Sequence, residues 1–241
     1  MRDFYLPESM ARARRQIEFE DEFGSYTSGQ FWTSLASDGG VTAPVGVDAE
    51  WGRVSMATAA TDNNEVMVRS TNEIALFQAD GSFMFQSLIQ FTESNTDDAN
   101  VAVGMANAAG ADLLSDNGGG DNINSSGVLI FKVDGETVWR CASEINGTIV
   151  ETQSDQTAGG ASFQMLSIIG RPVDGTNYEF TYFLDDKALT TTANGITRPI
   201  RHRLAYASAT EMRLVAGYIK AGSASEETLL IDYCAFTAVR V

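Results

Sequence analysis

The chain has little of the chemistry that catalytic and metal-binding proteins concentrate at their sites. Its 241 residues include one histidine, two cysteines and four prolines. A single histidine, His202, excludes a histidine-rich metal site and gives no basis for a Ser-His-Asp triad. Cys141 and Cys234 lack the spacing of zinc ligands, and no phosphate-binding loop or dinucleotide fingerprint is present. We therefore assign no catalytic, cofactor-binding or metal-binding residue and expect the chain not to be an enzyme.

Long apolar runs and positive charge are also scarce. No run of about 18 apolar residues occurs, so we expect no membrane partner. The N-terminus lacks the apolar segment of a signal peptide, and we expect the protein to fold in a cytoplasm. The formal net charge of −16 repels nucleic acid phosphates, so we expect no nucleic-acid partner. Solubility is the simplest explanation of this charge.

Segments with alternating apolar residues run along most of the chain. The clearest are Gly127–Glu144, Tyr178–Thr190 and Glu227–Val241. A period of two is typical of a strand with one buried face, and Asp134-Gly135 between two such runs indicates a hairpin. Because no long helix connects these segments, the strands are expected to pair antiparallel. The pattern predicts an all-β fold, a two-sheet antiparallel jelly-roll sandwich.

We predict two parts, an N-terminal arm of residues 1–16 and a single β-sandwich domain of residues 17–241. The arm concentrates arginines in an acidic protein and has no strand alternation. Glu8–Gln16 is expected to form one or two helical turns. The arm is predicted to bind a neighbouring subunit or assembly, and the alternative is a disordered tail. The predicted partner-binding residues are Phe4, Tyr5, Leu6, Met10, Arg12, Arg14 and Arg15.

The histidine and the cysteines have simple structural interpretations. His202 stands among Arg198, Arg201 and Arg203, so we predict a surface or interface residue. The two cysteines lie in predicted strands and are interpreted as buried thiols of the core. Spacing alone does not decide whether they form a disulfide, so that alternative stays open.

Calcium is the one cofactor for which ligands could be found. The longest irregular stretch, Asp112–Ser126, carries acidic residues beside a glycine run, and long loops are often functional. Neither candidate set has the spacing of an EF-hand, and a flexible loop is the alternative interpretation. The oxygen-bearing residues of the two sets are Asp116, Asp121 and Asn122, and Asp97, Asp98 and Asn100.

One cluster of carboxylates could support hydrolysis of a glycosidic bond. Alternation places Glu18, Glu20 and Glu22 on one face of the first predicted strand. Retaining hydrolysis needs two carboxylates about 5–5.5 Å apart. The cluster has no tryptophan nearby to bind a sugar, and we favour the interpretation of a solvated strand face.

Two segments of the second half resemble a known fold family. Phe180–Leu189 (FTYFLDDKAL) and Leu229–Phe236 (LLIDYCAF) are similar to a hairpin and the closing strand of concanavalin A-like lectin/glucanase sandwiches, including laminin-G-like modules. The resemblance spans residues 82–241 approximately and says little about function, because this fold hosts many activities. The glucanases of the family carry acidic residues in the order E-x-D-x-x-E or E-x-D-x-E on a mid-chain strand. The cluster at Glu18–Glu22 departs from that order.

A second resemblance concerns function. Ala60–Glu65, Phe83–Gln90, Asn100–Gly104 and Gly127–Trp139 together resemble tailed-phage virion proteins encoded among head and tail genes. This resemblance implies a non-enzymatic virion structural protein, a capsid decoration or cement protein that stabilises the shell through subunit contacts. It implies the major capsid protein or another virion protein as partner, self-association as a homotrimer, and a place in the virion after assembly in the host cytoplasm.

Two alternative functions remain open. The first is a lectin-like module of the virion or another surface, which would bind glycans through calcium or through exposed Trp32 or Trp51. Trp139 is expected to pack in the core instead, because it lies in a strand beside other apolar residues. The second is a diverged glycoside hydrolase using the carboxylates of the first strand.

Overall fold

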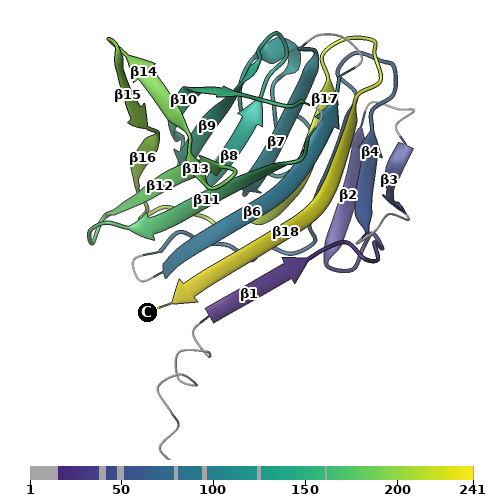
Figure 1. Cartoon of the computed structure of the whole chain (residues 1–241). Coiled ribbons are helices and arrows are strands. Elements are labelled where there is room, and N and C mark those ends of the chain that lie inside the picture. Colours follow the sequence, from purple (N-terminus) through teal and green to yellow (C-terminus); the bar gives the residue numbers. More distant parts are fainter. Residues whose placement is uncertain are drawn as a thin grey trace, which may run out of the picture.

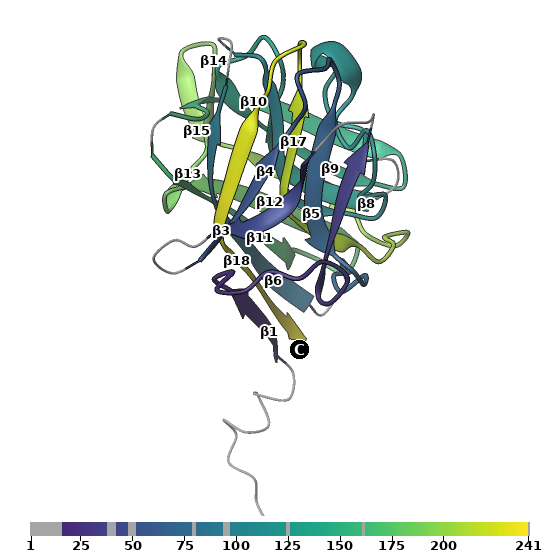
Figure 2. The same ribbon diagram turned by 90° about the vertical axis from the view of Figure 1, so that its right-hand side faces the viewer.

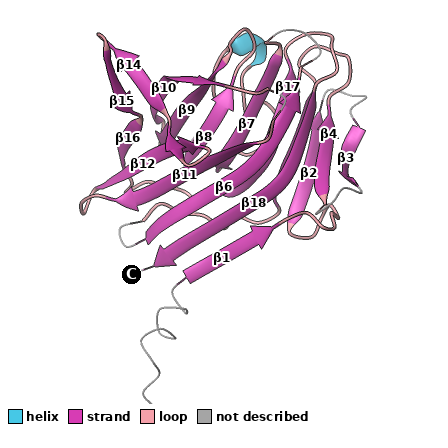
Figure 3. Cartoon of the chain, viewed as in Figure 1, coloured by secondary structure: helices cyan, strands magenta, loops and turns pink. Residues whose placement is uncertain are grey.

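The computed structural model describes residues 16–37, 42–47, 52–78, 81–93, 97–123, 126–160 and 162–240. These residues form two antiparallel sheets packed face to face (Figures 1 and 2). Strands dominate, and the one helical element of the described residues is the short 3-10 turn η1 (Asp116–Gly118) (Figure 3). The predicted all-β antiparallel sandwich is confirmed.

Sheet A is the nine-stranded layer. Its path is β13-β12-β11-β6-β18-β4-β3, with β1 paired to β18 and β16 paired to β12. The strands of sheet A are β1 (Gln16–Asp21), β3 (Thr42–Val47), β4 (Arg53–Ala57), β6 (Gly81–Thr92), β11 (Gln164–Pro172), β12 (Asn177–Leu184), β13 (Lys187–Ala188), β16 (Arg201–Ala205) and β18 (Thr228–Arg240).

Sheet B is the seven-stranded layer, in the order β10-β9-β8-β7-β17-β5-β2. A separate two-stranded hairpin, β14–β15, projects beyond the sandwich at the upper left of Figure 1. The remaining strands are β2 (Trp32–Ser37), β5 (Glu65–Ser70), β7 (Ala99–Ala106), β8 (Ser126–Lys132), β9 (Val138–Ile145), β10 (Thr148–Thr157), β14 (Thr190–Ala193), β15 (Ile196–Pro199) and β17 (Arg213–Ala221).

The hairpins expected from the sequence are present. β8 pairs with β9 around a turn in which Gly135 has φ +79°, a conformation that glycine adopts without strain. β12 pairs with β13 around Asp185 and Asp186, whose φ values of 48° and 63° suit aspartate better than most side chains. Local turn chemistry therefore sets both registers.

The core lies between the sheets and follows the alternation of the strands. In β6 the buried side chains occur at every second position, from Phe83 through Phe91. β18 keeps the same face inward from Leu229 to Phe236 only because its register shifts between Ile231 and Tyr233. This irregularity adds one residue, so Phe236 points inward like Ile231 although their separation is odd.

Both cysteines and Trp139 belong to this core. Cys141 lies on sheet B and Cys234 on sheet A, and both are buried free thiols, which removes the disulfide alternative. Burial raises the pKa of both thiols. Trp139 is fully buried, with its ring 5.9 Å from that of Phe91 in an edge-on arrangement. The core positions predicted for these three residues are confirmed.

The first described strand lies beside the last. β1 pairs antiparallel with β18 from Gln16 opposite Val239 to Asp21 opposite Cys234. The start of β1 and the end of β18 therefore meet at one end of the sandwich (Figure 1). Apart from Gln16, which is in a strand, the helical turns expected at Glu8–Gln16 lie outside the described residues.

Candidate functional site

The loop between β7 and β8 covers part of the outer face of sheet B. Leu113, Leu114 and Ile123 of this loop are fully buried in one apolar cluster with Leu129 and Phe131 of β8. Burying a large apolar side chain stabilises a fold by about 1.5–3 kcal/mol. The expectation of a flexible loop is wrong for its described part, which is a packed cover.

Lys220 of β17 fastens this cover to the sheet. Its side chain is fully buried, and its ammonium group donates to Asp112 Oδ1 at 2.8 Å and forms an ion pair with Asp116. Burial lowers the pKa of Lys220, but the two carboxylates outweigh it and hold the pKa above its usual value. Glu65 of β5 accepts the backbone N–H of Asp112 at 2.9 Å. Lys220 of β17 and Glu65 of β5 thus hold the loop between β7 and β8 against sheet B.

Some of the side chains considered as calcium ligands have partners within the protein. Asp116 binds Lys220, while Asp121 lies beside Glu151 on the same face of the sheet. Burial first, and then Glu151, raises the pKa of Asp121 to about 7. In the second set, Asn100 accepts the backbone N–H of Asp134 at 3.0 Å. Among the residues that the structure describes, no group of three acidic, histidine or cysteine side chains is placed to hold a metal ion.

The carboxylates of the first strand lie on the outer surface of sheet A. Glu18, Glu20 and Glu22 are exposed and share one face, as the alternation predicts. Asp21 points to the other face, where its Oδ2 accepts the indole N–H of Trp32 at 2.8 Å. A tryptophan is therefore near this strand after all, but on the side away from the glutamates. The three glutamates form a solvated strand face.

The interpretation of His202 as a surface residue is wrong. His202 is only 2% exposed. Its Nδ1 lies 2.9 Å from Tyr182 Oη and 3.2 Å from Ser143 Oγ. Its Nε2 lies 3.0 Å from Thr152 Oγ1. Burial lowers its pKa to about 4. The neighbouring arginines of β16 are exposed on the opposite face of the strand, which makes His202 a structural residue between the sheets.

The buried imidazole makes stability depend on pH in a known direction. Unfolded His202 takes up a proton below about pH 6.5, whereas the folded residue resists protonation until about pH 4. The contribution of neutral His202 to the free energy of unfolding is complete above the pKa of the unfolded state, and it decreases as the pH falls toward the pKa of the folded state. Between about pH 7 and pH 5 we expect urea unfolding to show that the unaltered protein loses about 2 kcal/mol relative to a His202→Gln variant, because the raised pKa of Asp121 changes stability in the opposite direction but does so equally in both proteins. The chain has no other histidine, so equal losses in both proteins would contradict this assignment.

An aromatic and polar surface lies between β1 and β2. Trp32 is 4% exposed and so is not the exposed sugar platform expected, while Trp51 lies outside the described residues. The neighbouring Phe31 is 37% exposed and stacks on Phe19 at 3.9 Å between ring centroids. An open pocket of about 390 Å³ borders Phe31, and its other lining residues are Asp21, Gly24, Ser25, Thr27, Gln30 and Trp32.

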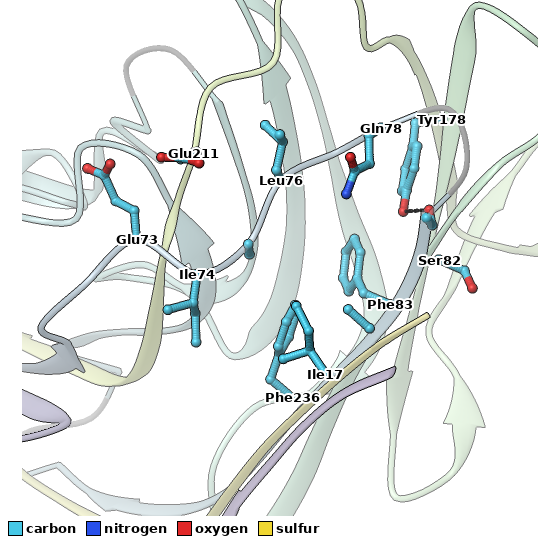
Figure 4. Close-up of a pocket in the computed structure, with 13 residues that line it drawn as sticks. Ile17, Glu73, Ile74, Leu76, Gln78, Ser82, Phe83, Tyr178, Glu211 and Phe236 are labelled. Carbon is cyan, nitrogen blue, oxygen red and sulfur yellow. Dashed lines mark hydrogen bonds between the residues drawn. The ribbon is translucent and has the colours of Figure 1, made fainter. Parts of the chain in front are cut away.

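A deeper and more apolar cavity lies at the end of the sandwich where β1 begins. It has a volume of about 340 Å³ and is enclosed by sheet A and the segment Glu73–Gln78, which follows β5. Figure 4 shows Ile17, Phe83 and Phe236 on one side of this end cavity, with Leu76 across from them. These side chains come from both ends of the described chain, so pairing of β1 with β18 builds the wall.

Packing fixes the aromatic wall, while the rim carries charge. The ring of Phe83 lies 6.1 Å from that of Tyr178 and 6.0 Å from that of Phe236, and Tyr178 donates to Gly81 O at 2.5 Å. Glu73 and Glu211 stand at one end of the cavity in Figure 4. The arrangement can bind an apolar group that carries a positive charge beside it.

The residues singled out for partner binding are not part of the described chain. This holds for all seven, so their role stays a prediction. They are Phe4, Tyr5, Leu6, Met10, Arg12, Arg14 and Arg15. Neither cavity follows from a sequence motif, because each is assembled from strands and loops that are distant in the chain.

No family model and no curated protein matches the chain. Solved structures, in contrast, are similar to the chain. A protein of unknown function from Shewanella oneidensis MR-1, SO2946, aligns with a TM-score of 0.56 and 11% identity over 100% of this chain and 97% of that chain. An endo-1,3-beta-glucanase from Streptomyces sioyaensis aligns with a TM-score of 0.61 and 12% identity over 94% and 98%.

Lectins are also among the similar structures. Peanut lectin aligns with a TM-score of 0.58 and 14% identity over 94% of this chain and 98% of that chain. Because the similar structures include both lectins and a glucanase, and all identities are low, the likeness concerns the fold and not the activity. The chain has a concanavalin A-like β-sandwich fold.

Proposed function

We propose that the chain is a non-enzymatic structural protein of a bacteriophage virion, a capsid decoration or cement protein. The observation that carries the non-enzymatic part is the covered face of sheet B. Leu113, Leu114 and Ile123 cover part of the outer face of sheet B, so that part of the sheet is closed to a substrate. The phage context is supported by the resemblance of the sequence segments to head and tail proteins.

The distribution of carboxylates also supports a role without catalysis. A glycosidase needs two carboxyl groups facing each other across a bound sugar. Glu18, Glu20 and Glu22 lie side by side on an open strand face. In the end cavity, Glu73 is engaged in an ion pair with Arg213 at 2.8 Å. These carboxylates thus serve solvation or ion pairs.

A decoration protein stabilises a shell by mass action. Any partner that binds only the assembled state shifts the equilibrium toward it by RT ln(1 + [L]/Kd), about 2.7 kcal/mol when the free partner is at 100 Kd. The rigid sandwich would supply the bulk of such a partner, and the arm of residues 1–16 would supply reach. The acidic surface would keep unbound copies dispersed.

Cryo-electron microscopy of the particle, with co-sedimentation of purified protein and particles lacking it, tests this proposal. We expect stoichiometric, saturable binding and density for the sandwich on the shell. A protein that is absent from the particle and ignores purified capsids would refute the virion role.

Glycan binding is a second candidate, favoured by the exposed ring of Phe31 beside a polar pocket. Aromatic rings with adjacent hydroxyl and amide groups suit the apolar face and hydroxyls of a sugar. Phe31→Ala is expected to abolish binding on a glycan array, whereas Ile149→Ala, at a 49% exposed residue of β10, leaves it unchanged. An array without any signal for the unaltered protein would exclude this function.

A further inference from the structure

The end cavity is the strongest unassigned binding surface among the described residues. Its volume of about 340 Å³ falls in the range of ligand pockets, about 300–1,000 Å³. Leu76 is 37% exposed at its wall, although most large apolar residues of the described chain are buried. The aromatic residues of the wall, Phe83, Tyr178 and Phe236, are buried, so Leu76 is the large apolar side chain that a bound apolar group would cover.

The charge at its rim narrows the chemistry of the occupant. Glu211 is exposed, and Glu73 is partly exposed beside its partner Arg213. An occupant that combines large apolar side chains with arginines would therefore match both wall and rim. The chain itself contains such a segment in its first fifteen residues, with Phe4-Tyr5-Leu6 followed by Arg12, Arg14 and Arg15.

The position of this segment is also suitable. Ile17, the second residue of β1, already lines the cavity, so the first fifteen residues join the described chain beside it. From Gln16 back to Leu6 the chain spans at most about 33–36 Å when extended, or about 15 Å as a helix. With such a reach the apolar group could cross to a neighbouring molecule whose end cavity faces this end of the sandwich.

Between the apolar group and β1, Pro7 and Ser9 lie close to Leu6 in the sequence, and the residues next to β1 carry no turn signal. Residues 11–16 read ARARRQ and contain no glycine, proline, asparagine or aspartate, the residues that make tight turns. Alanine, arginine and glutamine favour a helix instead. Residues 11–16 thus offer no tight turn beside β1, which is why we assign the apolar group to a second molecule and not to the same one.

We propose that the end cavity receives the N-terminal segment of a second copy of the chain, with Phe4, Tyr5 and Leu6 in the cavity and the arginines near Glu73 and Glu211. Exchange of segments closes a dimer or, in a ring, the trimer expected from the sequence. The inference rests on the structural role proposed above, because it names the surface that joins the subunits. Its test uses purified protein alone, so it can fail independently of the particle experiment.

The test uses full-length variants and light scattering after size-exclusion chromatography. An arm variant carries Phe4→Asp and Leu6→Asp, and a cavity variant carries Leu76→Asp at the exposed wall. The control is Ile196→Asp, which changes a 53% exposed apolar residue on the β14–β15 hairpin. We expect oligomers for the unaltered protein and the control, and monomers for both other variants.

Mixing distinguishes exchange between molecules from any other effect. The arm variant keeps an intact cavity and the cavity variant keeps an intact arm, so their mixture is expected to form a complex that neither forms alone. A second cavity variant, Glu211→Arg, changes an exposed rim residue, so misfolding is not expected to explain its effect. It is expected to weaken association between subunits at least tenfold at low salt. A monomeric unaltered protein, oligomeric arm or cavity variants, or a mixture without complex would each overturn the proposal.

Discussion

Replacing Gly104 with alanine is expected to lower the free energy of unfolding by about 4 kcal/mol. Gly104 lies in β7, between Leu129 of β8 and Val215 of β17, and has φ +141°, a conformation that L side chains rarely adopt. A Cβ atom there would collide with the carbonyl oxygen of Val128 and lie 3.0 Å from Leu129 Cα. Backbone atoms of a central strand cannot move aside, so the unfavourable φ and the steric overlap of the Cβ atom both lower the stability of the variant.

Denaturant unfolding of Gly104→Ala and Gly175→Ala measures this effect. A Cβ atom added at Gly175 would have no neighbouring atom within 4 Å, and Gly175 has no left-handed φ. Its variant is therefore expected to stay within about 0.5 kcal/mol of the unaltered protein. Similar losses in the two variants would show that β7 shifts easily within sheet B.

Local signals predicted the hairpins and the fold class, but not the way in which the strands combine. Asp134-Gly135 and Asp185-Asp186 act within a few residues, and turn geometry is decided at that range. The pairing of β1 with β18 joins residues at opposite ends of the sequence, such as Gln16 and Val239, and no local pattern encodes it. The register shift near Asp232 could be seen only as a break in the alternation of the closing segment, which we did not interpret as a bulge.

His202 shows where reasoning from composition failed. Its arginine neighbours suggested a surface, yet Arg201, His202 and Arg203 alternate, and a strand turns its middle residue to the opposite face. The period of two was therefore the better signal. A histidine can be buried when both ring nitrogens have partners, here hydroxyl groups from three other strands.

The loop over sheet B was misjudged for a similar reason. Asp116, Asp121 and the glycine run suggested either calcium ligands or a flexible loop. Instead, burial of the adjacent apolar side chains Leu113 and Leu114 fixes the loop against the sheet. The one clue to the anchor of the loop was Lys220, a charge that follows the uncharged stretch Leu214–Ile219 of β17. Which carboxylates neutralise that charge depends on tertiary contacts alone.

This anchor gives the second large effect that we expect. Asp112→Ala together with Asp116→Ala should lower the free energy of unfolding by about 3 kcal/mol, because the fully buried ammonium of Lys220 loses both carboxylates. The carboxylates are themselves more than half exposed, so solvent screening reduces the effect below that of a completely buried pair. Deprotonation of Lys220 limits the cost at neutral pH to about 5 kcal/mol.

Adding Lys220→Met to that double variant separates the charge from the packing. Methionine fills a similar volume without a charge, and replacing a buried ionic group by an apolar one is often neutral. Chemical denaturation should therefore show that the triple variant regains most of the lost stability. If it stays as unstable as the double variant, the loss comes from the loosened loop and not from the ammonium. Recovery would show that Asp112 and Asp116 are needed because Lys220 is buried, and that the apolar contacts of Leu113, Leu114 and Ile123 keep the cover on sheet B without them.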